Sequence, residues 1–218
     1  MPTLKFLEPL GGRFLVDAPV TLTLIRHGQT TANVAHALDT ALPGAPLTPH
    51  GEEQARELRP FVGEQLTFSS EALRARQTAT LAASNYQGAW PGLKEIAAGE
   101  LEMRNDSAAI TAFATGWYEM TRNPETGRIP GGETAQEFLQ RYLTALGELL
   151  TSHGSIAVVT HGSAMALCGI LATGKTYEEA DKIDNCHTIV MRVPAGDIIE
   201  SFGQWTLESW GTHQVGLG

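Results

Sequence analysis

Short runs of apolar, β-branched residues alternate along the chain with longer segments of helical periodicity. Residues 21–25 and 156–160 are continuous apolar runs, and each predicts a buried strand. A shorter run at 67–69 predicts another strand. The runs at 188–193 and 205–210 predict later strands, which would suit antiparallel positions at a sheet edge.

Apolar residues at helical spacing fill the intervals between these runs. Thr48 has the side chain of an N-cap and opens a predicted helix over 48–65. The clearest amphipathic helix is 133–153, and further helices are expected at 72–85 and 163–173. Strand and helix therefore alternate, which predicts an α/β fold with a mostly parallel central sheet and helices on both faces.

Two segments stand apart from this alternation. Asn, Asp, Thr, Gly and Pro are scattered through residues 102–132, and we expect a lid-like excursion that covers a site rather than a core element. Residues 1–20 form an N-terminal extension, whose apolar stretch 14–16 could add a strand or a hairpin or contribute to a homodimer contact. Because we find no repeat, low-complexity tract or linker, we expect residues 1–218 to form a single domain.

Composition narrows the possible partners. The hydrophobic fraction of 42% and charged fraction of 18% are ordinary for a globular protein. A formal net charge of −9 argues against nucleic-acid binding, and no apolar run is long enough to cross a membrane or to act as a signal peptide. Only two cysteines occur, both in apolar contexts that favour free buried thiols, so we expect a soluble protein in the reducing cytoplasm.

Candidate chemistry follows two of the predicted strands directly. The strand at 21–25 runs into Arg26-His27-Gly28, and the strand at 156–160 runs into His161-Gly162. If the two strands are parallel neighbours, both histidines lie side by side at the carboxyl edge of the sheet, where α/β folds bind ligands. Each glycine lets backbone N–H groups approach an anion closely. Either motif alone describes an ordinary turn, but the pair indicates an anion site.

An arginine after a third strand strengthens this interpretation. Arg74 follows the strand at 67–69 and opens a helix, where the helix dipole favours negative charge. Arg26 and Arg74 would both supply planar forks that match phosphate oxygens. For Arg76 a solvent-exposed position is the better interpretation.

These residues resemble the histidine phosphatase superfamily, which includes the cofactor-dependent phosphoglycerate mutases. The resemblance spans residues 21–193 and implies a phosphoglycerate mutase-like fold. Its motifs occur in order as Arg26-His27-Gly28-Gln29-Thr30 with Asn33, Pro46-Leu47-Thr48 with Gly51 and Gln54-Ala55, Ser69–Ala79, Leu93-Lys94-Glu95-Ile96 with Gly99, Gly131-Gly132-Glu133-Thr134, and Val158-Val159-Thr160-His161-Gly162.

The resemblance also implies roles for individual residues. His27 would be the nucleophile that becomes phosphohistidine, and Glu95 would be the proton donor. Arg26, Arg74 and His161 would bind the phosphoryl oxygens and complete the catalytic set. Further phosphate-binding candidates are Asn33, Thr30 and Gly162.

General chemistry accounts for these residue types independently. Phosphoryl transfer needs an in-line nucleophile and positive charge around the equatorial oxygens, and a neutral imidazole is a good nucleophile. An alkoxide leaving group needs a proton, and Glu95 beside a bound phosphate dianion should have a raised pKa that helps it hold one. With the two arginines and two histidines supplying positive charge, we expect neither a metal nor a cofactor.

The chain departs from the family pattern where family members bind the leaving group. Ala32 stands where an aromatic residue is common, and Leu101-Glu102-Met103 replaces a common Trp-Glu-Gly. Where family members commonly carry an Arg and a Gly-containing turn, this chain has residues 36–40 and then Pro43-Gly44-Ala45. We therefore expect a histidine acid phosphatase-type phosphoric monoester hydrolase that acts on a small phosphorylated metabolite, without assigning the ester.

Two alternatives remain open. One is a cofactor-dependent phosphoglycerate mutase, although the interval between Glu95 and Gly131 is short for the lid that a mutase needs. The other is a non-catalytic module that binds phosphorylated ligands, which would need neither His27 nor Glu95. A Rossmann dehydrogenase lacks its glycine motif here, and a zinc hydrolase lacks its His-Glu-x-x-His motif.

Overall fold

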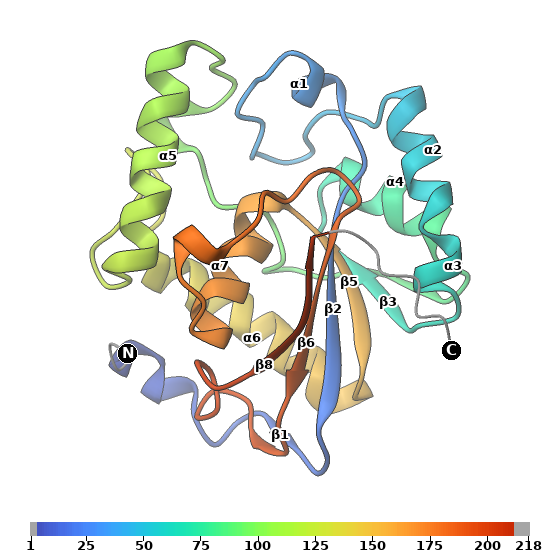
Figure 1. The fold of residues 1–218 in the computed structure, drawn as a ribbon, viewed down its shortest axis with the longest axis vertical. Coiled ribbons are helices and arrows are strands. Elements are labelled where there is room, and N and C mark those ends of the chain that lie inside the picture. Colours follow the sequence, from blue (N-terminus) through green and yellow to red (C-terminus); the bar gives the residue numbers. More distant parts are fainter. Residues whose placement is uncertain (1–3, 212–218) are drawn as a thin grey trace.

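A central six-stranded sheet organises the protein, for which a computed structural model describes residues 4–211. In spatial order its strands are β4 (Tyr86–Ala89), β3 (Thr67–Ser69), β5 (Ile156–Thr160), β2 (Val20–Arg26), β6 (Thr188–Val193) and β8 (Thr206–Gly211). The first four strands are parallel, whereas β6 pairs antiparallel with β2, and β8 antiparallel with β6. The predicted mostly parallel sheet with an antiparallel edge is therefore confirmed (Figure 1).

Helices cover both faces of this sheet. They are α1 (Thr31–Val34), α2 (Pro49–Glu57), α3 (Arg59–Val62), α4 (Leu73–Ala82), α5 (Ser107–Arg122), α6 (Ala135–His153) and α7 (Gly162–Thr173), with short 3₁₀ turns η1 (Lys5–Leu10), η2 (Gly99–Leu101) and η3 (Tyr177–Glu179). Strand β5 is buried throughout because it is covered on both sides. Ile156 and Val158 join the core cluster of α6 and α7, and Ala157 and Val159 join the cluster of α3 and α4.

The predicted helix over 48–65 is divided into two. Thr48 caps α2 as expected, because its Oγ1 accepts a hydrogen bond from Gly51 N at 3.0 Å. The helix ends at Glu57, and α3 begins at Arg59 with Pro60 in its first turn. Proline has no N–H for an intrahelical hydrogen bond and its ring crowds the preceding turn, so Pro60 accounts for the break.

Helix α6 begins two residues later than the predicted start because Thr134 is its N-cap. Thr134 Oγ1 accepts from Glu137 N at 3.1 Å, and Glu137 Oε2 accepts from Thr134 N at 2.7 Å. This reciprocal capping box leaves Glu133 outside the helix, where it makes other contacts.

The segment 102–132, expected as a lid-like excursion rather than a core element, contains the 16-residue helix α5. Asp106 caps the helix by accepting from Ala109 N at 3.0 Å. Ala109 and Met120 are fully buried in the main core cluster, so this segment does contribute to the core. The Gly and Thr residues that obscured the helical pattern include Gly116, where a Cβ would lie 2.6 Å from the carbonyl oxygen of Arg128.

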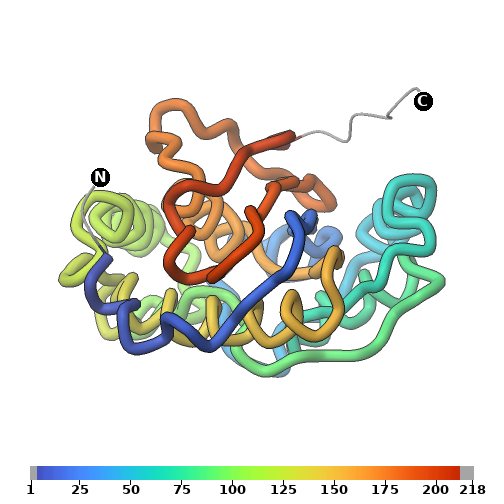
Figure 2. The backbone as a smooth tube through the Cα atoms, turned by 90° about the horizontal axis from the view of Figure 1, so that it is seen from below, coloured from blue at the N-terminus to red at the C-terminus, as the bar shows by residue number. Residues whose placement is uncertain are grey.

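The N-terminal extension packs back onto the molecule, and its residues 1–3 lie outside the described part, as do residues 212–218 at the other end. Of the alternatives for 14–16, the strand is present: β1 (Leu15–Val16) pairs antiparallel with β7 (Gly196–Asp197). The blue segment with η1 lies beside yellow α6 in Figure 2, and Gln140 Nε2 of α6 donates to Phe6 O at 3.2 Å.

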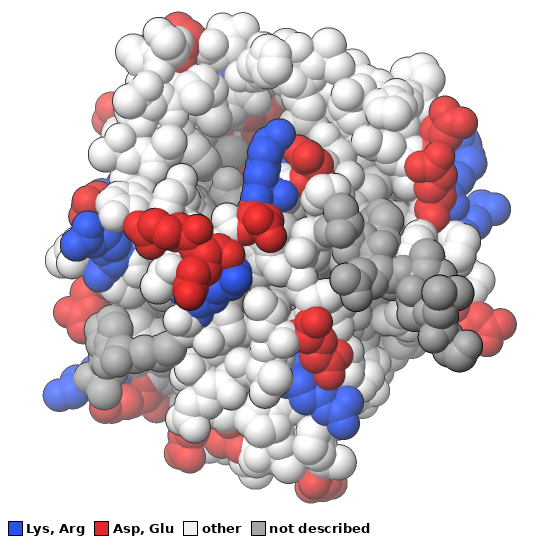
Figure 3. Space-filling model, viewed as in Figure 1, with Lys and Arg blue, Asp and Glu red and all other residues white. Residues whose placement is uncertain are grey.

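Among the described residues, no helix is both long enough and apolar enough to span a bilayer. On the face drawn in Figure 3, acidic and basic side chains lie in small mixed groups rather than in a broad basic surface. Cys168 and Cys186 are free and buried.

Candidate active site

Two histidines meet where the central parallel strands end. Arg26 of β2 lies opposite Thr160 of β5 in the strand register, so His27 and His161 leave the sheet at the same level. Their ring centroids are 5.3 Å apart in an edge-to-face arrangement. Both side chains are almost completely buried. The adjacency expected from the strand ends is therefore present in the structure.

A close backbone contact holds the loop after His27. A Cβ on Gly28 would lie 2.4 Å from the carbonyl oxygen of Gly51, which leaves no room for a side chain. Gly28 N donates to Thr78 Oγ1 of α4 at 3.0 Å. The loop is thus anchored to α2 and α4, and this fixes the direction of the His27 ring.

The hydrogen bonds of His27 define its tautomer. Arg74 Nε lies 3.1 Å from His27 Nε2, and since a guanidinium can only donate, Nε2 is the acceptor. Nδ1 therefore carries the proton and donates to Gly28 O at 2.8 Å. Burial, followed by the charges of Arg74 and Arg26, holds the pKa of His27 well below its usual value. His27 is thus neutral at pH 7, with its lone pair on Nε2.

His161 is held in the complementary way. Its Nδ1 accepts from the same Arg74 Nε at 3.3 Å, and its Nε2 donates to Ser70 Oγ at 2.8 Å. Burial is again the main reason that the pKa of His161 lies well below its usual value, with Arg74 adding to it. One N–H group therefore lies between two neutral imidazoles, so among the described residues of the site the positive charge expected of the histidines is supplied by Arg74 and Arg26 alone.

Arg74 occupies the centre of the site with only 2% of its surface exposed. Its Nη2 donates to Asp39 O at 3.0 Å, and its Nη1 lies 3.4 Å from Asp39 Oδ2. Gly44, with φ of +73°, passes so close that a Cβ would lie 2.1 Å from Nη1. The loop that departs from the family pattern thus encloses and partly neutralises this guanidinium.

Arg26 presents an unsatisfied donor to the same region. Its Nη1 donates to Ile183 O at 2.6 Å, whereas its buried Nε has no hydrogen-bond partner among the described residues. A Cβ on Gly162 would lie 3.1 Å from this Nε, so glycine at this position makes room for the guanidinium. Buried donors are almost always paired, which makes Nε a ready partner for an incoming oxyanion.

Glu95 lies at the N-terminus of α7. Its carboxylate accepts hydrogen bonds from Ser163 N at 3.1 Å, Ala164 N at 2.8 Å and Ile96 N at 2.9 Å. Burial raises the pKa of Glu95 despite these hydrogen bonds and the charge of Arg74, which act in the opposite direction. In the protein alone the pKa of Glu95 is raised by burial, and a further rise beside a bound phosphate dianion stays a prediction.

Thr30 and Asn33 form a reciprocal cap on the short helix α1. Thr30 Oγ1 accepts from Asn33 N at 3.0 Å, and Asn33 Oδ1 accepts from Thr30 N at 3.1 Å and from Asn185 Nδ2 at 3.2 Å. Only the amide Nδ2 of Asn33 could then donate to a phosphoryl oxygen. Phosphate binding by Thr30 and Asn33 stays a prediction.

Several residues of the site are not evident from the sequence. Ser70 directly follows β3, and its position at a strand end is a usable signal. Asp39 stands out only as a departure from the family pattern. Asn185, whose Nδ2 donates to His27 O at 3.0 Å, gives no signal because the contact joins positions 158 residues apart. Within residues 4–211, no group of three or more His, Cys, Asp and Glu side chains is arranged to hold a metal ion.

Comparison with known proteins places this geometry in a family. The model of the histidine phosphatase superfamily (branch 1) matches residues 22–207. A curated relative, probable phosphoglycerate mutase GpmB of Enterobacter sp. (strain 638), is 30% identical over 204 residues, which cover 88% of this chain and 91% of that protein.

Solved structures show the same architecture. A putative α-ribazole-5′-P phosphatase from Escherichia coli K-12 is 27% identical, with a TM-score of 0.65 over 91% of this chain and 99% of that one. The α-ribazole phosphatase from Shigella flexneri is also 27% identical, with a TM-score of 0.67 over the same shares. Mycobacterial hydrolase 1 is 22% identical with a TM-score of 0.71 over 90% of this chain and all of that one, which supports the fold alone.

The lowered pKa values of the two buried histidines predict a pH-dependent stability. Below about pH 6.5 the histidines of the unfolded chain become protonated, whereas folded His27 and His161 stay neutral. The free energy of unfolding therefore falls as the pH falls, by up to about 1.4 kcal/mol per pH unit for each histidine. The raised pKa of Glu95 has the opposite effect on the free energy of unfolding. Its stabilising contribution is present at low pH and is lost as the pH rises through the pKa of Glu95 in the folded protein. His27→Gln should therefore flatten the slope between about pH 6.5 and 5.

Urea unfolding at a series of pH values measures this slope. The wild-type protein unfolded under the same conditions provides the reference slope. A His27→Gln protein that keeps the full slope would show that His27 is protonated in the folded state.

Proposed function

This chain belongs to the histidine phosphatase superfamily (branch 1), and on that basis we propose that it hydrolyses a small-molecule phosphate monoester through a phosphohistidine intermediate on His27. The observation that carries the proposal is the neutral His27, whose Nε2 lone pair lies 3.1 Å from Arg74 Nε. Around it stand the unpaired Nε of Arg26 and the carboxyl of Glu95, whose pKa is raised.

In the first step the substrate's phosphoryl oxygens take over donors that the protein already presents. Arg74 Nε moves its hydrogen bond from His27 Nε2 to a phosphoryl oxygen, and Arg26 Nε gains a partner. The freed lone pair of Nε2 attacks phosphorus, the N–P bond forms and the ester P–O bond breaks. Glu95 gives its proton to the leaving oxygen, which departs as an alcohol.

The second step returns the enzyme to its starting state. The Glu95 carboxylate accepts a proton from water, the water oxygen attacks phosphorus, and the N–P bond electrons return to Nε2. Phosphate leaves and Glu95 is protonated again. Throughout, Nδ1–H of His27 donates to Gly28 O, which stabilises the positive imidazole of the phosphohistidine.

The charge of the site favours hydrolysis over a mutase reaction. A mutase that transfers its phosphoryl group to a substrate still carrying phosphate must hold a bisphosphorylated intermediate. Here the outer nitrogens of Arg74 are already engaged by Asp39, which leaves charge suited to one phosphoryl group. The mutase remains the second candidate because curated relatives at 30% identity bear that name.

The same residues argue against a module that only binds a phosphorylated ligand. A binding site needs donors such as Arg26 and Arg74, but it needs neither a lone pair directed into the cradle nor a carboxyl group with a raised pKa. We further propose that the substrate is a small phosphorylated metabolite, and that the protein acts in the reducing cytoplasm, where its buried thiols would stay free.

A covalent phosphohistidine on His27 is the first expected result. Rapid quenching with a phosphoryl-labelled substrate should leave acid-labile, base-stable label on the wild-type protein. His27→Ala should carry no label and lose at least about 10³-fold in turnover, as expected for removal of a nucleophile. His50→Ala should be labelled like the wild type, and near-normal turnover by His27→Ala would overturn the mechanism.

Activity is expected to persist without metal ions. Arg26 and Arg74 supply the positive charge that Mg²⁺ supplies in other phosphoryl transfer enzymes. Steady-state turnover in excess chelator should match that of the untreated protein within a factor of about two. Activity that collapses in chelator and returns with a divalent ion would contradict a metal-free mechanism.

Glu95→Gln should separate acid catalysis from binding. An alkyl phosphate has a poor leaving group that needs the proton, so its turnover should fall by about 10²-fold or more. The burst of nitrophenol from p-nitrophenyl phosphate should change much less, because that leaving group departs largely unaided. Equal losses in both bursts with a parallel rise in KM would make Glu95 a binding residue.

A further inference from the structure

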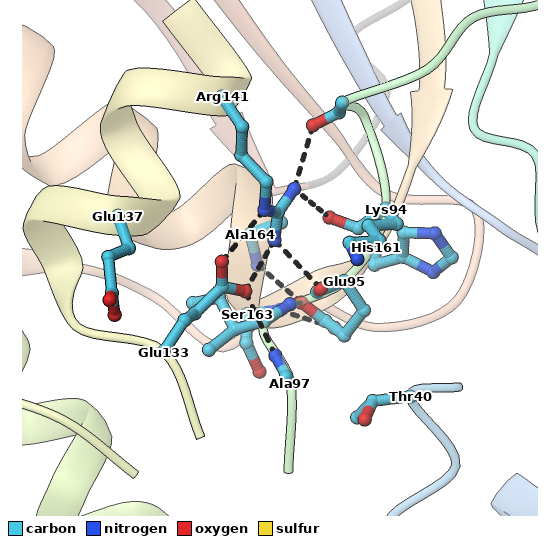
Figure 4. A network of polar contacts seen from close by, with 12 residues as sticks. Thr40, Lys94, Glu95, Ala97, Glu133, Glu137, Arg141, His161, Ser163 and Ala164 are labelled. Carbon is cyan, nitrogen blue, oxygen red and sulfur yellow. Dashed lines mark hydrogen bonds and ion pairs between the residues drawn. The ribbon is translucent and has the colours of Figure 1, made fainter. Parts of the chain in front are cut away.

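We propose that Arg141, together with Glu133, is a positioning residue that holds Glu95 at the distance and angle required for proton transfer. The inference rests on the proposed role of Glu95 as the acid. Arg141 belongs to α6 and points toward the loop that carries Glu95, with His161 beside that loop (Figure 4).

Arg141 binds the Glu95 loop through three backbone carbonyls. Its Nη1 donates to Gly92 O at 2.7 Å and to Lys94 O at 2.9 Å, and its Nη2 donates to Glu95 O at 2.9 Å. The remaining N–H groups bind Glu133, with Nε to Oε2 at 2.8 Å and Nη2 to Oε1 at 2.5 Å. Every N–H of the guanidinium is therefore used, which only the planar fork of arginine permits.

Glu133 extends this anchoring to the far side of Glu95. Its Oε1 also accepts from Ala97 N at 3.0 Å, so the chain is tied both before and after Glu95. The pair is largely enclosed, with 19% of the Arg141 side chain and 14% of the Glu133 side chain exposed. Partly buried, multiply hydrogen-bonded charges of this kind keep a single geometry.

The Glu95 loop needs such an anchor because it has no regular structure of its own. Residues 93–98 lie between β4 and η2, outside any helix or strand. Gly92, with φ of +89°, lets the chain pass so close to α6 that a Cβ would lie 2.8 Å from Arg141 O. A catalytic group displaced by about 1 Å can lose about 10²-fold in rate, so the anchor bears directly on proton donation.

This role differs from that of an ordinary surface ion pair. Arg56 and Glu52 of α2 form an i,i+4 pair at 2.9 Å whose side chains are 49% and 43% exposed. Such a pair contributes little and contacts no catalytic loop. It provides a matched control, in which the same residue types are replaced at a position that contacts no catalytic loop.

The test compares leaving groups in Arg141→Met, Arg141→Lys, Glu133→Gln and the control Arg56→Met. Arg141→Met should reduce kcat for an alkyl phosphate by about 10²-fold with KM unchanged, and should leave the rate of the nitrophenol burst near the wild-type value. Arg141→Lys and Glu133→Gln should show smaller losses of kcat, again for the alkyl phosphate and not for the nitrophenol burst. Arg56→Met should lose activity with neither substrate. In Arg141→Met/Glu95→Gln the loss should not exceed that of Glu95→Gln alone, because both changes act on one proton transfer.

The amplitude of the nitrophenol burst gives the concentration of active sites, so each rate can be corrected for protein that fails to fold. If Arg141→Met cannot be purified, Arg141→Lys and Glu133→Gln provide the test. Equal losses for both leaving groups, or additive losses in the double variant, would make the Arg141 contacts merely structural and overturn the inference. If Glu95→Gln lowers the rates with both leaving groups equally, Glu95 is not the acid. If no phosphohistidine forms on His27 in the wild-type protein, the proposed function itself is wrong.

Discussion

One buried N–H group, Nε of Arg74, determines the state of both histidines in this site. It lies 3.1 Å from His27 Nε2 and 3.3 Å from His161 Nδ1, and it forces each of these nitrogens to be an acceptor. Because the guanidinium cannot give up its proton, the tautomer of each ring follows without further assumptions. The nucleophilic nitrogen is thereby selected by a neighbour rather than by the histidine itself.

This arrangement is costly, and the surrounding structure offsets the cost. A buried guanidinium without a counter-charge is strongly unfavourable, and two of them would also repel each other. Asp39 supplies charge and a carbonyl to Arg74, Ile183 O accepts from Arg26, and burial keeps the histidines neutral so that they add no further positive charge. The loop of residues 39–44, which departs from the family pattern, thus both encloses the proposed phosphate site and lowers its positive charge.

The sequence is informative wherever a local pattern coincides with the final architecture. Continuous apolar runs predict β2 and β5, and the His-Gly that follows each run predicts the paired histidines at the edge of the sheet. The sequence is less informative where long-range contacts decide. Helix α5 is obscured by its Gly and Thr residues, Pro60 divides a predicted helix, and Asn185 reaches His27 only through tertiary packing. Arg141 is hidden for the same reason, since the four residues that accept its five hydrogen bonds come together only when α6 packs beside the Glu95 loop.

The position of Glu95 shows how the fold combines opposing demands on one group. Three backbone N–H groups, two of them at the N-terminus of α7, favour its charged form, whereas burial favours the neutral form and prevails. A proton donor that must become a base within the same cycle requires both forms to be accessible, and each form of Glu95 has its own source of stabilisation here. Because His161 immediately precedes α7, the helix that receives the carboxylate is also the one that follows the phosphate-binding histidine. The distance between acid and nucleophile is therefore set by the packing of α7 against β2.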